Sequence, residues 1–126
     1  MAWEIGDHGY EIVLSGYVPH ILGDNIRQTV IPFLQSAGCE KEDMVTWAVH
    51  PGGKAILDRV GNALELPENA LDLSRDILRR YGNMSSATIL FLLEKSLAQK
   101  NSGPCAAMAF GPGLTVEMGL FHPVLT

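Results

Sequence analysis

The chain has 126 residues, which is enough for one domain with a buried core of its own. Hydrophobic residues make up 47% and charged residues 18%, a balance that excludes a disordered chain. The formal net charge of −5 and the lack of a basic tract argue against a nucleic-acid partner.

Cysteine usage and the terminal residues indicate a reduced, cytoplasmic protein. Cys39 and Cys105 lie far apart and show no CxxC or metal-like spacing. The first residues lack the basic-then-apolar layout of a signal peptide. The longest apolar run, residues 87–93, is far too short to span a bilayer. We therefore expect no metal site and no membrane association.

The first third of the chain predicts a strand followed by a long helix. Residues 1–9 are expected to form an irregular lead-in, and residues 10–15 alternate partially, as a strand does. A helix is expected with Pro19 in its first turn, where proline loses no hydrogen bond, and with Gly38 as its stop. Pro32 lies inside this run and predicts a kink or a restart. The apolar positions with helical spacing are Ile21, Leu22, Ile26, Val30 and Leu34.

The remainder predicts a second strand, three helices and a closing strand pair. Helices are expected from Lys54, from Ala70 and from Ser85, and the last is nearly apolar all round, as a central helix would be. The expected strands are residues 44–49, 105–110 and 114–120. The first of the three helices is expected to show its apolar residues at Ala55, Ile56, Val60 and Leu64. This order of elements is typical of an α/β domain with a mixed, largely buried sheet.

A histidine at the end of the second strand is the first candidate for chemistry. His50 follows Trp-Ala-Val and precedes Pro-Gly-Gly, so a rigid strand holds it on one side. Glycines on the other side let backbone and ligand approach closely. Positions just outside the carboxyl end of a strand commonly carry working side chains in open α/β sheets. A histidine in an ordinary surface turn explains the segment equally well.

The second candidate is Asn83, in the segment Tyr-Gly-Asn-Met-Ser-Ser-Ala of residues 81–87. It lies between the glycine that ends one predicted helix and the start of the next. A side-chain amide at the positive end of a helix is a good donor to an oxyanion or a thioester carbonyl. Asparagine is also a favoured cap or turn residue, and on this segment alone that interpretation is the stronger one.

The third candidate is the turn between the last two strands. Residues 109–115 read Ala-Phe-Gly-Pro-Gly-Leu-Thr, a rigid turn with little side-chain bulk that would form a smooth wall of a pocket. An ordinary β-turn accounts for the same residues. The GxxxxGK[ST] pattern of a phosphate loop is absent.

Together the three segments resemble one family. WAVHPGGKAILD (residues 47–58), YGNMSSA (81–87) and FGPGLTVE (110–117) have the order and spacing of the carboxyl-terminal half of type III polyketide synthases, the chalcone and stilbene synthase family. The resemblance covers nearly the whole chain and makes residues 1–126 one domain. It implies a thiolase-like α/β fold of two similar halves with the active site between them. This half would carry a mixed, five-stranded-type sheet with helices packed on it.

The resemblance implies a cysteine–histidine–asparagine triad in which His50 and Asn83 take the last two places. The family's nucleophilic cysteine lies in the amino-terminal half, and neither Cys39 nor Cys105 matches its motif. We therefore expect this chain alone to be inactive and to need the amino-terminal half as its partner. For the complete enzyme the resemblance implies a homodimer that uses acyl-CoA and malonyl-CoA as substrates and needs no further cofactor.

Substrate-contacting positions also follow from the resemblance. Ala109 stands where the family's motif usually has glycine, so its methyl group would trim the cavity. The family's gatekeeper phenylalanine falls near Ile12, where an aliphatic residue would suit a wider entrance for aliphatic starters. Ala55 would lie beside the pantetheine tunnel. The positions expected to contact substrate are Ile12, Gly52, Gly53, Ala55, Phe110, Gly111, Pro112 and Gly113.

Two alternatives stay open at this point. One is a non-catalytic truncated or split domain that acts as a scaffold or interaction partner. The other is a condensing enzyme similar to the initiating ketoacyl-ACP synthases, whose histidine usually lies in a His-Gln-Ala-Asn context. Here Pro-Gly-Gly follows His50, which favours the polyketide synthase interpretation.

Overall fold

The computed structural model describes residues 2–13, 16–99, 103–112, 114–122 and 124. Within them the chain forms five strands, four α-helices and one short 3₁₀ helix. In chain order these are β1 (Ala2–Gly6), β2 (Gly9–Val13), α1 (Val18–Ser36), η1 (Lys41–Asp43), β3 (Thr46–Val49), α2 (Lys54–Ala63), α3 (Asp72–Tyr81), α4 (Ala87–Ala98), β4 (Cys105–Gly111) and β5 (Thr115–Phe121).

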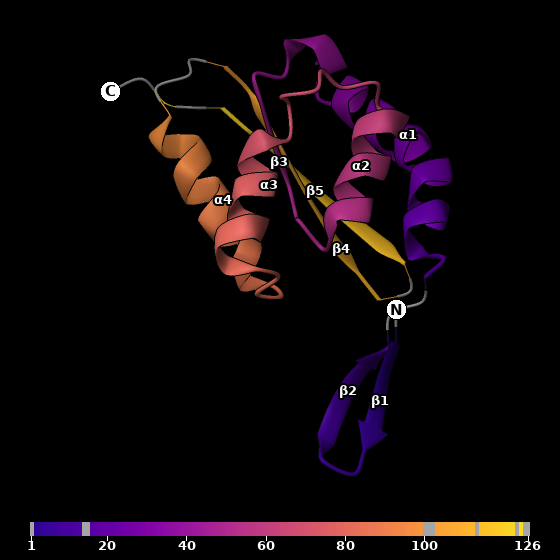
Figure 1. The fold of residues 1–126 in the computed structure, drawn as a ribbon. Helices are drawn as coiled ribbons and strands as arrows, with labels where there is room; N and C mark the ends of the chain where they lie inside the picture. Colours follow the sequence, from indigo (N-terminus) through magenta and orange to yellow (C-terminus); the bar gives the residue numbers. More distant parts are fainter. Residues whose placement is uncertain (1, 14–15, 100–102, 113, 123, 125–126) are drawn as a thin grey trace.

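The central sheet is mixed, as predicted, but within the described residues it has three strands, in the order β3-β4-β5, and not the expected five. β3 runs parallel to β4, and β5 pairs antiparallel with β4. The parallel pair needs a long crossover, which α2, α3 and α4 supply. β1 and β2 do not join this sheet but form a separate hairpin that projects from one end of the body (Figure 1).

Helices cover both faces of the central sheet, α1 and α2 on one side and α3 and α4 on the other (Figure 1). The alternation of side chains along β3 explains the two layers. Trp47 and Val49 pack in the core beneath α1 and α2, whereas Ala48 between them packs with Ile77 of α3 and Leu92 of α4. The sequence pattern of β3 is therefore that of a strand buried on both faces.

The long first helix begins and ends where its sequence indicates. Proline lies in its first turn, and Gly38 follows its end with a positive φ of 73°. The predicted restart at Pro32 does not occur, because α1 is one helix through that residue. Pro32 lies on the exposed side, where water can reach the carbonyl it leaves unbonded. The buried stripe that holds both halves of the helix is Leu22, Ile26, Val30 and Leu34.

The prediction of an irregular lead-in over residues 1–9 is wrong. β1 pairs with β2 from Trp3 opposite Ile12 to Gly6 opposite Gly9. The expected strand over residues 10–15 begins one residue earlier, and residues 14–15 lie outside the described part of the chain. Local sequence gave little sign of the first strand, because the intervening turn has no Asn-Gly or Asp-Gly pair.

Two helices differ from the sequence prediction in the faces they bury. α4 is not central in this chain, since Leu90 and Leu97 are 64% and 56% exposed. It buries only Thr88, Leu92 and Ser96, which are spaced one turn apart. In α2, Ala55 is exposed, and Leu57 replaces it in the buried stripe with Val60.

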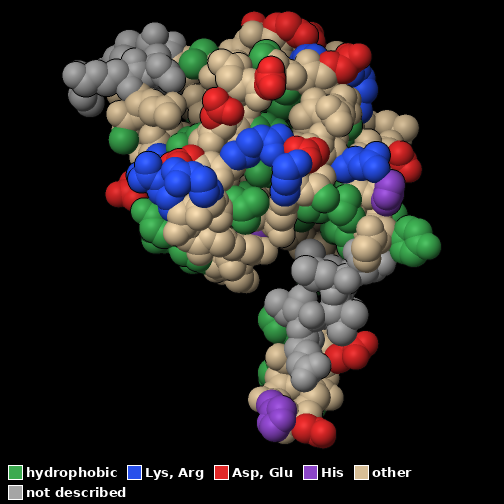
Figure 2. Space-filling view, viewed as in Figure 1, with side chains coloured by type: hydrophobic (Ala, Val, Ile, Leu, Met, Phe, Trp, Pro, Cys, Tyr) green, Lys and Arg blue, Asp and Glu red, His purple; other side chains and the backbone are tan. Residues whose placement is uncertain are grey.

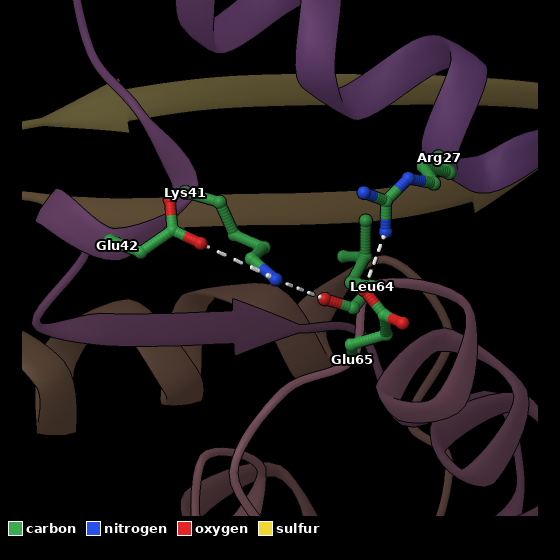
Figure 3. A network of polar contacts seen from close by, with 5 residues as sticks. All are labelled: Arg27, Lys41, Glu42, Leu64 and Glu65. Atoms are coloured by element: carbon green, nitrogen blue, oxygen red, sulfur yellow. Dashed lines mark hydrogen bonds and ion pairs between the residues drawn. The ribbon is translucent and has the colours of Figure 1, made fainter.

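The end of α2 is tied to the segment before β3 by a small polar network (Figure 3). Lys41 donates a hydrogen bond from Nζ to the carbonyl oxygen of Leu64 at 2.8 Å and lies 3.6 Å from a carboxylate oxygen of Glu42. Arg27 of α1 pairs with Glu65 at 3.0 Å just beyond. The half-buried Lys41 thus satisfies a carbonyl that the helix end leaves without an intrahelical partner.

No helix in the described ranges is long and apolar enough to cross a membrane.

Candidate active site

A pocket of about 610 Å³ opens at the end of the sheet where β3 ends. The first turns of α1, α2 and α4 meet the turn after β4 there, and the hairpin projects from the same end of the body (Figure 1). This is the position at which open α/β sheets commonly bind ligands. The residues that line it are Trp3, Gly16, Val18, Pro19, Leu22, His50, Gly52, Ile56, Asn83, Ser85, Ser86, Ile89, Ala109, Phe110 and Pro112.

His50 enters the pocket from the end of β3 and is held there by the neighbouring strand. Its backbone N–H donates to the carbonyl of Met108 at 2.8 Å, which extends the parallel pairing by one residue. Its own carbonyl accepts a bond from the N–H of Gly52 at 3.0 Å. Burial lowers the pKa of the imidazole below its ordinary value of 6.5, so the ring is neutral at pH 7. A neutral ring keeps one N–H donor and one acceptor nitrogen.

Asn83 reaches the same pocket from the loop between α3 and α4. Its Oδ1 accepts the N–H of Ser85 at 2.9 Å, which directs the amide nitrogen the other way. That nitrogen makes a long contact of 3.5 Å with the carbonyl oxygen of Gly52. The loop is further fixed because Thr88 Oγ1 accepts the N–H of Met84 at 2.8 Å. Asn83 is thus a turn residue rather than the helix cap, a place that Ser86 takes without a side-chain cap bond.

The turn after β4 forms another side of the pocket. Ala109, Phe110 and Pro112 line it, whereas Gly113 lies outside the described residues. Gly111 pairs with Thr115 across the strands, and a Cβ there would lie 2.6 Å from the threonine Oγ1. A side chain at Gly111 would therefore require the Thr115 hydroxyl to move.

The structure brings together some of the predicted substrate-contacting residues and separates others. Gly52, Phe110 and Pro112 line the pocket with His50 and Asn83. Gly53, Ala55 and Gly111 do not line it in the described part of the chain. Ile12 lies in β2, directly across from Trp3, which does line the pocket.

Several lining residues were not predicted from the sequence. The signal for most of them was weak, because they belong to helix starts, to the hairpin or to the turn before α1 rather than to a distinctive motif. Ser85 and Ser86 could have been predicted from the sequence, since they lie in the same segment as Asn83, residues 81–87. The lining residues not predicted as contacts are Trp3, Gly16, Val18, Pro19, Leu22, Ile56, Ser85, Ser86 and Ile89.

Neither cysteine belongs to the pocket. Cys105 begins β4, at the opposite end of that strand from the residues that line the pocket. Its thiol is buried, and burial raises its pKa, which disfavours the reactive thiolate. Cys39 lies beyond the end of α1. Among the described residues no group of histidine, cysteine, aspartate and glutamate side chains is placed to hold a metal ion.

Lysine and arginine side chains gather on the face formed by α2 and α3 (Figure 2). Most of them are paired with carboxylates on the same helices. Asp58 accepts from Lys54 and Arg75, both at 2.8 Å, and Asp76 pairs with Arg79 and Arg80. The hydrogen bond from Lys54 is the main reason that the pKa of Asp58 lies below its ordinary value.

Comparison with known proteins places the chain in one family. A family model described as chalcone and stilbene synthases, C-terminal domain, matches residues 1–125. The chain is similar to 1,3,6,8-tetrahydroxynaphthalene synthase of Streptomyces peucetius subsp. caesius, with 36% identity over 97% of this chain and 33% of the relative. It is similar to bisdemethoxycurcumin synthase of Oryza sativa subsp. japonica, with 38% identity over 87% of this chain and 30% of the relative.

Solved structures give the same result for the fold. PKS-I from the brown alga Ectocarpus siliculosus superposes with a TM-score of 0.88 and 30% identity, over 98% of this chain and 35% of that one. The C-terminal type III polyketide synthase domain of Steely1, a type I/III hybrid from Dictyostelium, superposes with a TM-score of 0.88 and 27% identity. The match covers 99% of this chain and 36% of that one. The chain spans about a third of the length of these relatives. It has the thiolase-like fold and belongs to the chalcone and stilbene synthase family, as a C-terminal domain.

Proposed function

We propose that this chain supplies the carboxyl-terminal half of a type III polyketide synthase active site. The reaction would be the decarboxylative condensation of malonyl-CoA with an acyl group taken from a starter acyl-CoA. The observation that carries the proposal is that His50 and Asn83, from separate loops, line one pocket at the carboxyl end of β3. A cysteine of an amino-terminal half would hold the acyl group.

The two side chains suit the charge that develops in this reaction. When malonyl-CoA loses carbon dioxide, the electron pair of the broken carbon–carbon bond moves onto the thioester oxygen as an enolate. Hydrogen-bond donors fixed around that oxygen stabilise the enolate. The N–H of neutral His50 and the amide N–H of Asn83 would be those donors. The contacts of Asn83 with Ser85 and Gly52 hold its amide in place beforehand.

His50 also suits the preceding acyl transfer. A cysteine attacks a thioester as its thiolate, and a nearby neutral imidazole can accept the thiol proton. Because burial lowers the pKa of His50, the ring is free to take that proton at pH 7. As the acyl group moves to the cysteine, CoA leaves as a thiolate and takes the proton back from His50, which is then neutral again. The enolate carbon then attacks the cysteine-bound acyl carbonyl. The new carbon–carbon bond forms as the cysteine leaves as a thiolate.

The first test measures malonyl-CoA decarboxylation by the complete synthase, with this domain joined to or co-expressed with its amino-terminal half. We expect His50→Ala and Asn83→Ala each to lower the rate by on the order of a hundredfold, because each removes a donor to the enolate. Release of labelled carbon dioxide from malonyl-CoA reports the step directly. The 126-residue chain by itself should form no polyketide.

Matched substitutions away from the pocket serve as controls. His122 follows β5 at the opposite end of the sheet, and Asn62 lies in the last turn of α2, far from the helix start that lines the pocket. His122→Ala and Asn62→Ala should leave decarboxylation near the wild-type rate. Near wild-type decarboxylation by either pocket variant would refute the role assigned to that residue.

A further inference from the structure

Ser85 has an unusual backbone conformation beside the pocket. Its φ is 59°, in the left-handed region that few residues other than glycine adopt. A residue keeps such a conformation only where its surroundings fix it. Ser85 lines the pocket two residues after Asn83, so this strained backbone lies next to a candidate catalytic side chain. The groups that fix Ser85 therefore also affect Asn83.

The left-handed turn gives the Asn83 amide a single orientation. The N–H of Ser85 donates to Oδ1 of Asn83 at 2.9 Å. A backbone N–H can bond only the oxygen end of a side-chain amide, so the amide nitrogen is directed away from Ser85. If the amide rotated, Oδ1 would carry its partial negative charge toward the enolate of the proposed reaction. The orientation of the amide thus decides whether Asn83 stabilises that enolate or repels it.

Thr88 binds the loop on both sides of Ser85. Its Oγ1 accepts the N–H of Met84 at 2.8 Å, and its own N–H donates to the carbonyl of Ser85 at 3.2 Å. Thr88 is fully buried in the first turn of α4, and in the described part of the chain it does not line the pocket. Leu92, one turn further along α4, packs in the core with Ala48 of the sheet. The loop is therefore attached to a helix that the core holds in place.

We propose that Thr88 is a positioning residue that acts on the reaction through Asn83. The inference rests on the proposed function and adds a residue that is not in the pocket. Without the Thr88 hydroxyl, the half-buried N–H of Met84 loses its acceptor, and the strained backbone at Ser85 is free to relax. Asn83 would still be present, but its amide would no longer be held in one orientation.

The test measures malonyl-CoA decarboxylation by the complete synthase. Thr88→Val keeps the branched shape of the side chain and removes the acceptor for the Met84 N–H. We expect kcat to fall by about tenfold and KM for malonyl-CoA to stay within about twofold of wild type, because the amide acts on the developing enolate. Thr88→Ser keeps the hydroxyl and should stay within about twofold of the wild-type kcat.

A second variant covers the case in which Thr88→Val does not fold. Thr88→Ala also lacks the acceptor, and its smaller side chain fits in the space that threonine fills. The matched control is Ser74→Ala. Ser74 is fully buried in α3, and its hydroxyl has no hydrogen-bond partner among the described residues. Removal of this buried hydroxyl should leave both kcat and KM unchanged.

A double-mutant cycle separates an effect through Asn83 from a general loosening of the pocket. In the Asn83→Ala background, Thr88→Val should cause no further loss of decarboxylation, since no amide is left to orient. A further loss of about tenfold in that background would overturn the proposal, because Thr88 would then act independently of Asn83.

Two other results would also overturn the proposal. One is a wild-type kcat in folded Thr88→Val or Thr88→Ala. The other is a loss in Thr88→Ser as large as that in Thr88→Val, because the hydroxyl would then not be the group that matters. Failure of the proposed function gives a different result, in which Asn83→Ala itself decarboxylates malonyl-CoA at near the wild-type rate.

Discussion

Burial of the His50 imidazole couples the candidate site to the stability of the domain. In the folded chain the pKa of His50 lies below 6.5, whereas in the unfolded chain it returns to that value. As the pH falls through 6.5, the unfolded chain therefore binds a proton before the folded chain does. Proton uptake therefore favours unfolding. The contribution of His50 to the free energy of unfolding is complete above pH 6.5 and is lost as the pH falls below that value.

The lowered pKa of His50 leads to a prediction of how the stability of the 126-residue chain depends on pH. The free energy of unfolding of wild type should fall relative to that of His50→Gln as the pH drops below 6.5, because glutamine does not titrate. Urea unfolding followed by circular dichroism at a series of pH values measures the difference. Parallel pH profiles for the two proteins would contradict the prediction, since both share every other titrating group.

Pocket residues in distinctive sequence segments were predictable from sequence. Pocket residues that only tertiary packing brings to the site were not. His50 and Asn83 stand at element ends that local patterns mark clearly, and both line the pocket. The turn role of Asn83 also follows from local chemistry. Trp3 carries no such mark, because only the pairing of β1 with β2 and the placement of the hairpin bring it to the pocket.

At the scale of elements, the two interactions in Figure 3 differ in what they contribute to stability, the Lys41 hydrogen bond more and the Arg27–Glu65 ion pair less. Lys41 is 15% exposed in its side chain, and it bonds a carbonyl at the end of α2. Arg27 and Glu65, by contrast, are 54% and 73% exposed, and water screens their attraction.

We therefore expect Lys41→Met to lower the free energy of unfolding by about 1–2 kcal/mol, because the Leu64 carbonyl loses its charged donor. Arg27→Met removes only the exposed pair and should change the free energy of unfolding by less than about 0.5 kcal/mol. Urea unfolding at neutral pH compares the two variants. If Arg27→Met were as destabilising as Lys41→Met, burial would not be the deciding factor.

Helices were predicted more accurately than the way they pack. Periodicity located all four α-helices in the described residues, because apolar spacing and glycine stops are local signals. The central position expected for α4 depended on which surface covers it, and no local pattern reports that. Within this chain α4 has the sheet on one side only, so Leu90 and Leu97 stay exposed.

At the scale of the whole molecule, those exposed leucines fit a domain that is covered in the complete synthase. The relatives are about three times as long as this chain, and the proposed function requires an amino-terminal half at the pocket. Exposed apolar side chains on one helix favour association in water. The isolated chain should therefore self-associate through α4.

Sedimentation velocity of the 126-residue chain over a range of concentrations tests this expectation. Leu90→Lys with Leu97→Lys should shift the chain toward monomer, because charges replace the apolar side chains. Ile21→Lys is the control, since Ile21 is also exposed but lies on α1, on the other side of the sheet. A wild-type chain that stays monomeric, or an equal effect of Ile21→Lys, would contradict a role for α4.

The parallel pairing of β3 with β4 also sets an order of events during synthesis. The bond from the His50 N–H to the Met108 carbonyl joins residues separated by three helices, so its loop must close late. On the ribosome, β3 has no partner in the central sheet until β4 has emerged, because β4 lies between β3 and β5. A premature stop between His50 and Cys105 would thus leave the candidate catalytic histidine in the chain but without the strand that holds it.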